Sequence, residues 1–232
     1  MFTDAIKGLD KIMHGDIKEG YVILVTGGPG TMKTAFTFTA MNGMLQNNKD
    51  RSGVYTTLEQ DFDEHMWNMK SFGIEPHPNL TVVDIVKAES MIKESLGREI
   101  DSLDYIEFLL KALHTDDNNN KPLCLALDSL NALLEFSNVD PSKKRKFVNH
   151  LFNILKKKKV VCFIIWETIE DLSNEHFLAD GILELGIDRK QRNEPTRYIA
   201  VRKMRGVHHE LGEFAIISEN DGLEIVSQKI SA

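Results

Sequence analysis

The sequence lacks any long hydrophobic run. Its longest apolar stretches, residues 21–25 and 160–166, are far shorter than the roughly 20 residues that a membrane-spanning helix needs. The N-terminal residues do not combine a basic region with an apolar stretch, so no secretion signal is predicted. Together these absences predict a soluble protein that stays in the cytoplasm.

Cysteine is scarce as well. Cys124 and Cys162 are the whole complement, and each lies inside an apolar, strand-like run. A buried, reduced thiol suits that setting better than a disulfide or a metal ligand. A zinc site is therefore not expected.

Positive charge is in deficit, with 28 Lys and Arg against 35 Asp and Glu and a formal net charge of −7. This balance argues against extensive contacts to a nucleic-acid backbone. Lysine and arginine are nevertheless concentrated at residues 143–146 and 156–159, which flank apolar residues at helical spacing. That spacing predicts an amphipathic helix with one face on the core. A solvated basic helix is the favoured interpretation, and a local nucleic-acid patch is the alternative.

The chain has enough apolar residues for one sizeable core. Its 232 residues are 42% hydrophobic and 27% charged, which are ordinary values for a globular protein. We expect a single domain that spans residues 1–232.

Strand-like and helix-like segments alternate along most of the chain. Apolar runs of strand length occur at residues 21–25, 54–58, 80–86, 123–127 and 160–166, and helical patterns occur at 62–72 and 105–114. Such continuous runs are typical of strands buried between two helical layers, so they predict an α/β fold with a mostly parallel central sheet flanked by helices.

Two further stretches complete this outline. The polar residues 115–122 are predicted to form a surface loop before a buried strand. After about residue 181, short strands at 182–185, 197–202 and 213–217 alternate with polar turns and predict a C-terminal antiparallel extension.

A glycine-rich segment separates the first predicted strand from the helix after it. It reads Gly27-Gly28-Pro29-Gly30-Thr31-Met32-Lys33-Thr34, the pattern and context of a phosphate-binding loop of the Walker A type. We expect its backbone N–H groups and the helix N-terminus to surround the β-phosphate. Lys33 is expected to bridge the β- and γ-phosphates, and the Thr34 hydroxyl to ligate Mg²⁺. The alternative is a glycine-rich turn before an ordinary helix.

Met32 breaks the usual pattern, because glycine normally precedes the lysine. A side chain at this position requires a backbone geometry that it tolerates and a place for the thioether away from the phosphates.

Two acidic residues follow predicted strands. Asp128 ends the run 123–127, at the carboxyl end where open α/β sheets bind ligands, and can hold Mg²⁺ through water. Helix capping by Asp128 or Ser129 is the alternative. Glu59 follows the strand 54–58 at the same edge and can orient or deprotonate an attacking water. The spacing alone supports equally well the alternative that Glu59 simply begins an acidic surface turn.

These motifs occur together in a chain that resembles, over nearly its whole length, the KaiC-like branch of the RecA-type ATPases. Besides the phosphate loop, the resemblance is carried by Gly8-Leu9-Asp10, Gly20, Leu58-Glu59, residues 127–133 and 179–185, Lys203-Met204-Arg205-Gly206 with His209, Gly212-Glu213, and residues 221–225. It implies a RecA-like P-loop NTPase fold that binds ATP and Mg²⁺. It also implies a homo-oligomeric ring, commonly a hexamer, with ATP held between neighbouring subunits.

The resemblance assigns roles to individual residues. It gives Glu59 the activation of water, and it sends Lys203 and Arg205 to the γ-phosphate of the neighbouring subunit, with His209 nearby. Taken without the family, Lys203 and Arg205 are simply a basic strand end that discourages aggregation.

The chain also departs from the family pattern. Gln60 stands where a second glutamate is common, and with Met32 it predicts slow hydrolysis. The cyanobacterial clock protein has phosphorylatable hydroxyls shortly before the stretch that matches Ala179-Asp180, whereas His176 and Phe177 stand here, so a clock role is not expected.

Three hypotheses follow. The first is a ring-forming ATPase that hydrolyses ATP slowly in a regulatory or signalling role, with an unidentified protein partner. The second is an ATP-bound switch or scaffold that hydrolyses weakly or not at all and resembles the ATP-binding component of the archaellum. The third, a recombinase-like DNA-binding ATPase, is disfavoured by the net charge.

Overall fold

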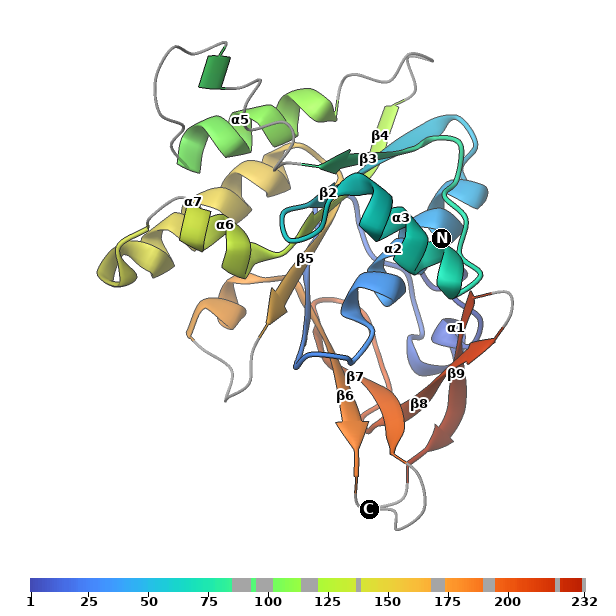
Figure 1. Cartoon of the computed structure of the whole chain (residues 1–232). Helices are drawn as coiled ribbons and strands as arrows, with labels where there is room; N and C mark the ends of the chain where they lie inside the picture. The colour runs from blue at the N-terminus through green and yellow to red at the C-terminus, as the bar shows by residue number, and fades with distance from the viewer. Residues whose placement is uncertain are drawn as a thin grey trace.

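The computed structural model describes residues 1–84, 93–94, 102–113, 121–136, 139–167, 174–189, 195–219 and 222–230. Its centre is a nine-stranded sheet with the strand order β3-β2-β4-β5-β1-β6-β7-β8-β9 (Figure 1). The strands are β1 Val22–Gly27, β2 Arg51–Thr57, β3 Leu80–Asp84, β4 Lys121–Asp128, β5 Val161–Glu167, β6 Gly181–Asp188, β7 Thr196–Met204, β8 Phe214–Glu219 and β9 Gly222–Lys229.

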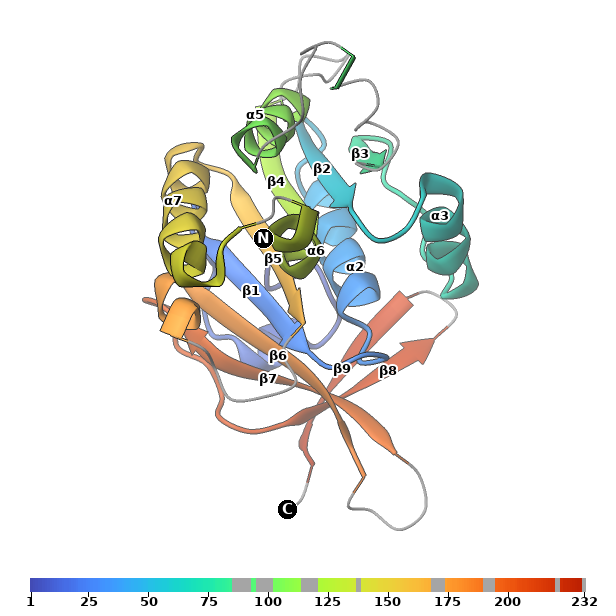
Figure 2. The same ribbon diagram turned by 60° about the vertical axis from the view of Figure 1, so that its left-hand side comes forward.

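Helices cover both faces of the parallel part of the sheet. They are α1 Leu9–Ile12, α2 Lys33–Gln46, α3 Phe62–Ser71, α5 Ser102–Ala112, α6 Leu130–Phe136 and α7 Lys144–Lys157, with 3₁₀ turns η1 Pro141–Lys143 and η2 Asn174–Leu178. Figure 2 shows α5, α6 and α7 on one side of the central strands, and α2 and α3 on the other. None of the helices in the described ranges is long and apolar enough to cross a membrane.

Two clusters of buried hydrophobic side chains, one on each face of the sheet, explain why the central strands are apolar at every position. Along β1, Ile23 and Val25 pack into the cluster formed with α1, α2 and α3, whereas Val22 and Leu24 pack into the cluster formed with α5, α6 and α7. Because side chains alternate between the faces of a strand, burial on both faces requires an uninterrupted apolar run. Both cysteines lie in such strands and are buried and free.

The strand directions confirm the predicted α/β architecture. From β3 through β2, β4, β5 and β1 to β6, each strand is parallel to the next one in the sheet. β7, β8 and β9 continue the sheet in antiparallel pairing, as expected for the C-terminal extension. The register places Gly27 beside Glu167 and Thr57 beside Asp128, so these four strands end at one edge of the sheet.

Several boundaries differ from the prediction. Lys121 and Pro122 begin β4 rather than ending a loop, while residues 114–120 lie outside the described ranges. The strand expected at 80–86 is β3, which ends at Asp84; residues 85 and 86 lie outside the described ranges. The sequence reading did not anticipate α1, α6 or β9.

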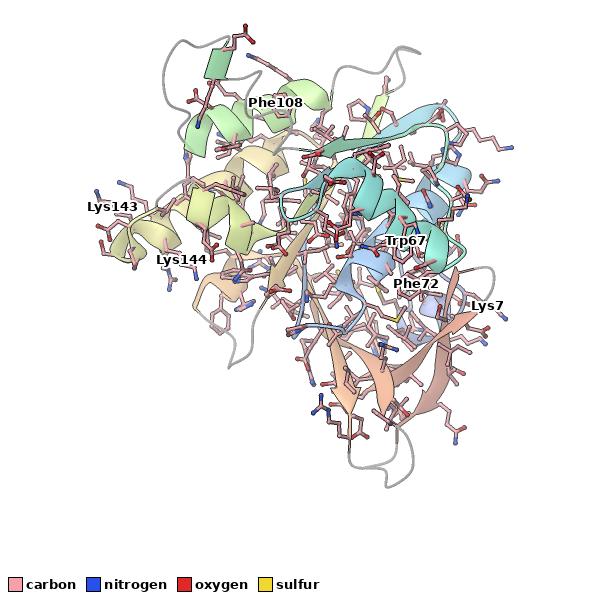
Figure 3. All side chains as sticks on the ribbon, in the orientation of Figure 1. Lys7, Trp67, Phe72, Phe108, Lys143 and Lys144 are labelled. Carbon is pink, nitrogen blue, oxygen red and sulfur yellow. The ribbon has the colours of Figure 1, made fainter. Side chains whose placement is uncertain are left out.

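The amphipathic helix expected around residues 143–159 is α7, which buries Val148, Leu151, Phe152 and Leu155. Two of its lysines have partners within the chain. Lys156 Nζ lies 3.0 Å from Asp180 Oδ1, and Lys144 Nζ lies 5.0 Å from the centre of the Trp166 ring. Figure 3 shows Lys143 and Lys144 at the end of this helix layer.

Candidate functional site

The glycine-rich segment joins β1 to α2 at the carboxyl edge of the sheet. Gly30 and Met32 both have left-handed backbone conformations, with φ of 74° and 73°, and α2 begins at Lys33. A left-handed residue with a Cβ costs roughly 1–2 kcal/mol. The half-buried Met32 side chain packs against the core, and this contact offsets part of the cost. The backbone thus adopts the geometry that glycine would favour while the side chain is used for packing.

Lys33 points back into the loop. Its Nζ donates to the Gly28 carbonyl at 3.0 Å and pairs with Glu167 Oε1 at 3.0 Å. The Lys33 side chain is only 7% exposed, whereas that of Glu167 is 41% exposed. The Thr31 hydroxyl donates to the same Gly28 carbonyl at 2.8 Å. The lysine is therefore held at the loop with its charge compensated by a carboxylate from the end of β5.

Sequence reasoning missed Glu167. The signal was available, because Glu167 directly follows the apolar run 160–166 just as Asp128 follows 123–127. Its place is fixed further by Asn131 in α6, whose side-chain amide exchanges two hydrogen bonds with the Glu167 backbone, at 2.8 and 3.2 Å.

Asp128 lies next to the first turn of α2. Its Oδ2 accepts hydrogen bonds from Thr34 Oγ1 at 2.8 Å and from Tyr55 OH at 2.6 Å. Burial raises the pKa of Asp128 to about 6, although the bonds from Tyr55 and Thr34 act in the opposite direction. A hydroxyl and a carboxylate are hard oxygen donors of the kind that Mg²⁺ prefers, so the pair Thr34 and Asp128 fits this metal.

Glu59 lies just beyond the end of β2. Its carboxylate accepts a hydrogen bond from the hydroxyl of Ser129, which follows Asp128 on the neighbouring strand. The acidic surface turn that was the alternative interpretation of Glu59 includes Asp61. Asp61 caps α3, since its side chain accepts a hydrogen bond from the Glu64 N–H at 2.8 Å. Glu59 therefore faces the same edge as Asp128.

A cleft of about 290 Å³ runs along this edge. Its lining combines the phosphate loop with the acidic strand ends and with one side of α3: Pro29, Gly30, Met32, Lys33, Thr34, Ala35, Glu59, Gln60, Asn68, Met69, Phe72, Asp128 and Glu167. Phe72, labelled in Figure 3, directly follows the end of α3 and lines this cleft. Ligand pockets typically enclose roughly 300–1,000 Å³, so the cleft of one chain is at the small end of that range.

The remaining candidates lie elsewhere. Gly181 pairs with Ile23 near the start of β1 and with Met204 at the end of β7, so Lys203 and Arg205 lie near the opposite edge of the sheet. From Ile23 to Gly27 the strand alone covers about 13 Å at 3.3 Å per residue. The structure therefore does not bring Lys203 and Arg205 to the phosphate loop of their own chain.

Lys203 and Arg205 are held by η2 and the residues after it. Lys203 Nζ donates to the carbonyls of Phe177 and Ala179 at 3.1 and 2.7 Å. Arg205 Nη1 pairs with Asp180 at 2.9 Å, while the Arg205 side chain remains 52% exposed. Burial and the neighbouring Arg205 charge lower the pKa of Lys203.

His209 lies in the segment after these two residues. It is half-buried, its Nδ1 lies 3.2 Å from the Val207 carbonyl oxygen, and its backbone bridges to Met13. It is not among the residues that line the cleft.

The whole constellation matches a known family. The model of the KaiC ATPase matches residues 3–230. The chain belongs to the KaiC ATPase family. This confirms the resemblance inferred from the phosphate loop, the strand-end acids and the C-terminal motifs.

Related proteins agree with this assignment. The UPF0273 protein PH0284 of Pyrococcus horikoshii is 28% identical, over 97% of this chain and 93% of its own length. The circadian clock oscillator protein KaiC of Prochlorococcus marinus is 23% identical over 95% of this chain, which matches only 44% of that longer protein. The crystal structure of the KaiC-like protein PH0186 of P. horikoshii superposes with a TM-score of 0.77 at 24% identity, covering 96% of both chains, which supports the fold.

Proposed function

We propose that this KaiC-family protein binds ATP with Mg²⁺ in the cleft beside the phosphate loop and hydrolyses it slowly. We further propose that it forms a homo-oligomeric ring, a hexamer as the family resemblance implies, in which neighbouring subunits complete each nucleotide site. The observation that carries the proposal is the alignment of Lys33, Thr34 and Asp128 at one edge of the sheet. Lys33 is buried and directed at the loop, and the Thr34 hydroxyl lies 2.8 Å from the buried Asp128 carboxylate. Apolar side chains would stabilise the fold equally well at these positions, so the polar groups indicate a ligand site.

Residues of the loop divide the work of binding. Backbone N–H groups of Gly28 and of residues 30–34, together with the start of α2, favour an anionic ligand, whereas Pro29 has no N–H to donate. Lys33 exchanges the Glu167 carboxylate for phosphate oxygens. Thr34 and Asp128 are the residues that would hold Mg²⁺, and the metal supplies charge neutralisation on those oxygens.

Hydrolysis needs a base for the attacking water, and Glu59 is the candidate. Its carboxylate is exposed at the cleft and is oriented by Ser129. Gln60 offers no second carboxylate, and its backbone is tied to the Thr57 hydroxyl at 2.9 Å. One base instead of two is the physical reason for expecting a low rate.

Lys203 and Arg205, the cations that the family resemblance assigns to the γ-phosphate, do not reach the cleft of their own chain. Arg205 is half exposed at the opposite edge, and the neighbouring Phe177 side chain is 66% exposed. A second copy packed head to tail would bring Lys203 and Arg205 toward the cleft, with His209 on the same segment. An arginine supplied in this way is worth roughly 10³–10⁵ in rate.

The nucleotide retained after native purification, measured together with the oligomer mass, tests this proposal. We expect ATP or ADP bound to a ring in the parent protein and no nucleotide in Lys33→Ala. Lys143→Ala, which removes an exposed lysine far from the cleft, is the control and should retain the parent's nucleotide. Equal ATP affinity in Lys33→Ala and the parent would refute the site assignment.

A second function is favoured by one observation, the engagement of Glu59 by Ser129 next to Gln60. A base held in this way suits a protein that keeps ATP and signals through its shape. Single-turnover measurements on preloaded protein distinguish the two, because a γ-phosphate that lasts for hours supports the switch, whereas steady release supports the ATPase.

A further inference from the structure

Tyr55 lies in the middle of β2, fully buried beneath the cleft. Its hydroxyl donates to Asp128 Oδ2 at 2.6 Å, the same oxygen that accepts from Thr34 Oγ1 at 2.8 Å. Neither the phosphate loop nor the assignment of Glu59 as base makes use of this residue. We propose that Tyr55 is a positioning residue that fixes the Asp128 carboxylate for the metal. This inference rests on the proposed Mg²⁺ and ATP function.

The ring of Tyr55 is clamped from both helices that border the cleft. Phe38 of α2 meets it edge-on, with ring centres 5.3 Å apart, and His65 of α3 lies 4.8 Å away. All three side chains are inaccessible to solvent. A tyrosine has few torsions to lose, so this packing places the hydroxyl at one point with no water to replace it.

The surroundings of His65 support the inference that the rings of Phe38 and His65 hold Tyr55 in place. Neither ring nitrogen of His65 has a hydrogen-bond partner among the described residues. Burial lowers its pKa to about 4, so the ring is neutral at pH 7 and adds no charge beside the phenol. The histidine therefore acts as an aromatic wall and does not compete with Asp128 for the hydroxyl.

The geometry divides the two oxygens of Asp128. Both side-chain donors among the described residues reach Oδ2, which leaves Oδ1 without a side-chain donor. A hydrogen bond from a neutral donor to a carboxylate is among the stronger kinds and favours the charged form that a metal requires. Removing the phenol oxygen would leave Thr34 as the only side-chain donor among the described residues and would free the carboxylate to turn.

Tyr55→Phe is the variant that tests this role, because it keeps the clamped ring and removes one oxygen. Binding of a fluorescent ADP analogue is titrated with Mg²⁺ and, separately, measured in EDTA. The loss of a hydrogen bond to a charged group predicts that about tenfold more Mg²⁺ is needed for the half-maximal effect. Nucleotide affinity in EDTA should stay within about twofold of the parent, since the phosphate loop is untouched.

Tyr198→Phe is the matched control. Tyr198 OH also donates to a carboxylate, Glu184 Oε1 at 3.1 Å, but in the pairing of β6 with β7. It should bind Mg²⁺ and nucleotide as the parent does. Thermal unfolding of both variants checks that each is folded, and a tenfold rise in Mg²⁺ should restore binding and turnover in Tyr55→Phe.

Three results would overturn the inference. The first is an unchanged Mg²⁺ requirement in folded Tyr55→Phe. The second is an equal loss of affinity with Mg²⁺ and in EDTA, which would make Tyr55 a structural residue only. The third is a parent protein that binds no nucleotide at all, which would remove the proposed function together with this inference, whereas the first two leave that function standing.

Discussion

The ion pair between Lys33 and Glu167 makes a specific prediction about ATP affinity. Glu167 Oε1 lies 3.0 Å from Lys33 Nζ. Phosphate oxygens must replace this carboxylate when ATP binds, so the strength of the pair subtracts from the binding free energy. Glu167→Gln keeps the shape of the side chain and removes its charge. We therefore expect this variant to bind ATP more tightly than the parent.

The size of the effect follows from exposure. Because the Glu167 side chain is 41% exposed, solvent weakens the pair, and its contribution is about 0.5–1 kcal/mol, near the upper end for solvent-accessible ion pairs. At 1.4 kcal/mol per tenfold change, this corresponds to a dissociation constant about two- to fivefold lower in Glu167→Gln. The difference should shrink as salt is added, since salt screens accessible charges.

Calorimetric titration of ATP with Mg²⁺ into parent and variant measures this directly. Glu19→Gln is the matched control, because Glu19 forms an ion pair with Arg51 at the same 3.0 Å with a 52% exposed side chain. It should leave ATP affinity unchanged. Weaker ATP binding by Glu167→Gln would refute the reasoning and would mean that the carboxylate assists the nucleotide or its metal.

Three further predictions concern other parts of the molecule. Glu59→Gln should slow hydrolysis by roughly 10²-fold or more in single-turnover assays without weakening ATP binding, as general bases typically contribute that much; an unchanged rate would exclude Glu59 as the base. Asp180→Ala should lower the free energy of unfolding by about 2 kcal/mol in urea titrations, mainly because the buried Val22 N–H loses its acceptor, while the solvent-accessible Lys156 and Arg205 add less; a loss under about 0.5 kcal/mol would contradict this. The raised pKa of Asp128, about 6, means that between about pH 4 and 6 the folded chain binds a proton that the unfolded chain has already released. Asp128 therefore contributes stability that falls as pH rises from about 4 to 6, whereas His65, whose pKa is lowered to about 4, contributes stability that rises over the same window. Relative to Asp128→Asn, the free energy of unfolding of the parent should thus fall as pH rises from about 4 to 6, while its Mg²⁺-dependent nucleotide binding improves over the upper part of that range; parallel pH profiles of the two proteins would contradict this.

Much of the fold and part of the site follow from local patterns in the sequence. Apolar runs such as 123–127 predict buried parallel strands because only burial on both faces requires them. The phosphate loop is contiguous in sequence, so its strand, glycines and helix start could be recognised together. Asp128 was found because a strand end can be read from where an apolar run stops.

What escaped prediction depends on pairing between distant segments. Tyr55 is an ordinary strand residue until the register of β2 and β4 sets its hydroxyl against Asp128. The separation of Arg205 from its own phosphate loop follows only from the antiparallel pairing of β7 with β6. α6 was missed because its seven residues follow a strand with too few turns for a helical period to be visible.

The central claim is that each nucleotide site is shared between two copies of the chain. Mixing two inactive variants tests it most directly: Lys33→Ala lacks the phosphate-loop lysine, and Arg205→Ala lacks the arginine at the opposite edge. In a head-to-tail ring, an intact site forms wherever the loop of an Arg205→Ala subunit meets Arg205 of a Lys33→Ala subunit. Random mixing at equal amounts should thus restore about a quarter of the parent ATPase activity. A mixture that stays as inactive as its two components would contradict the shared site.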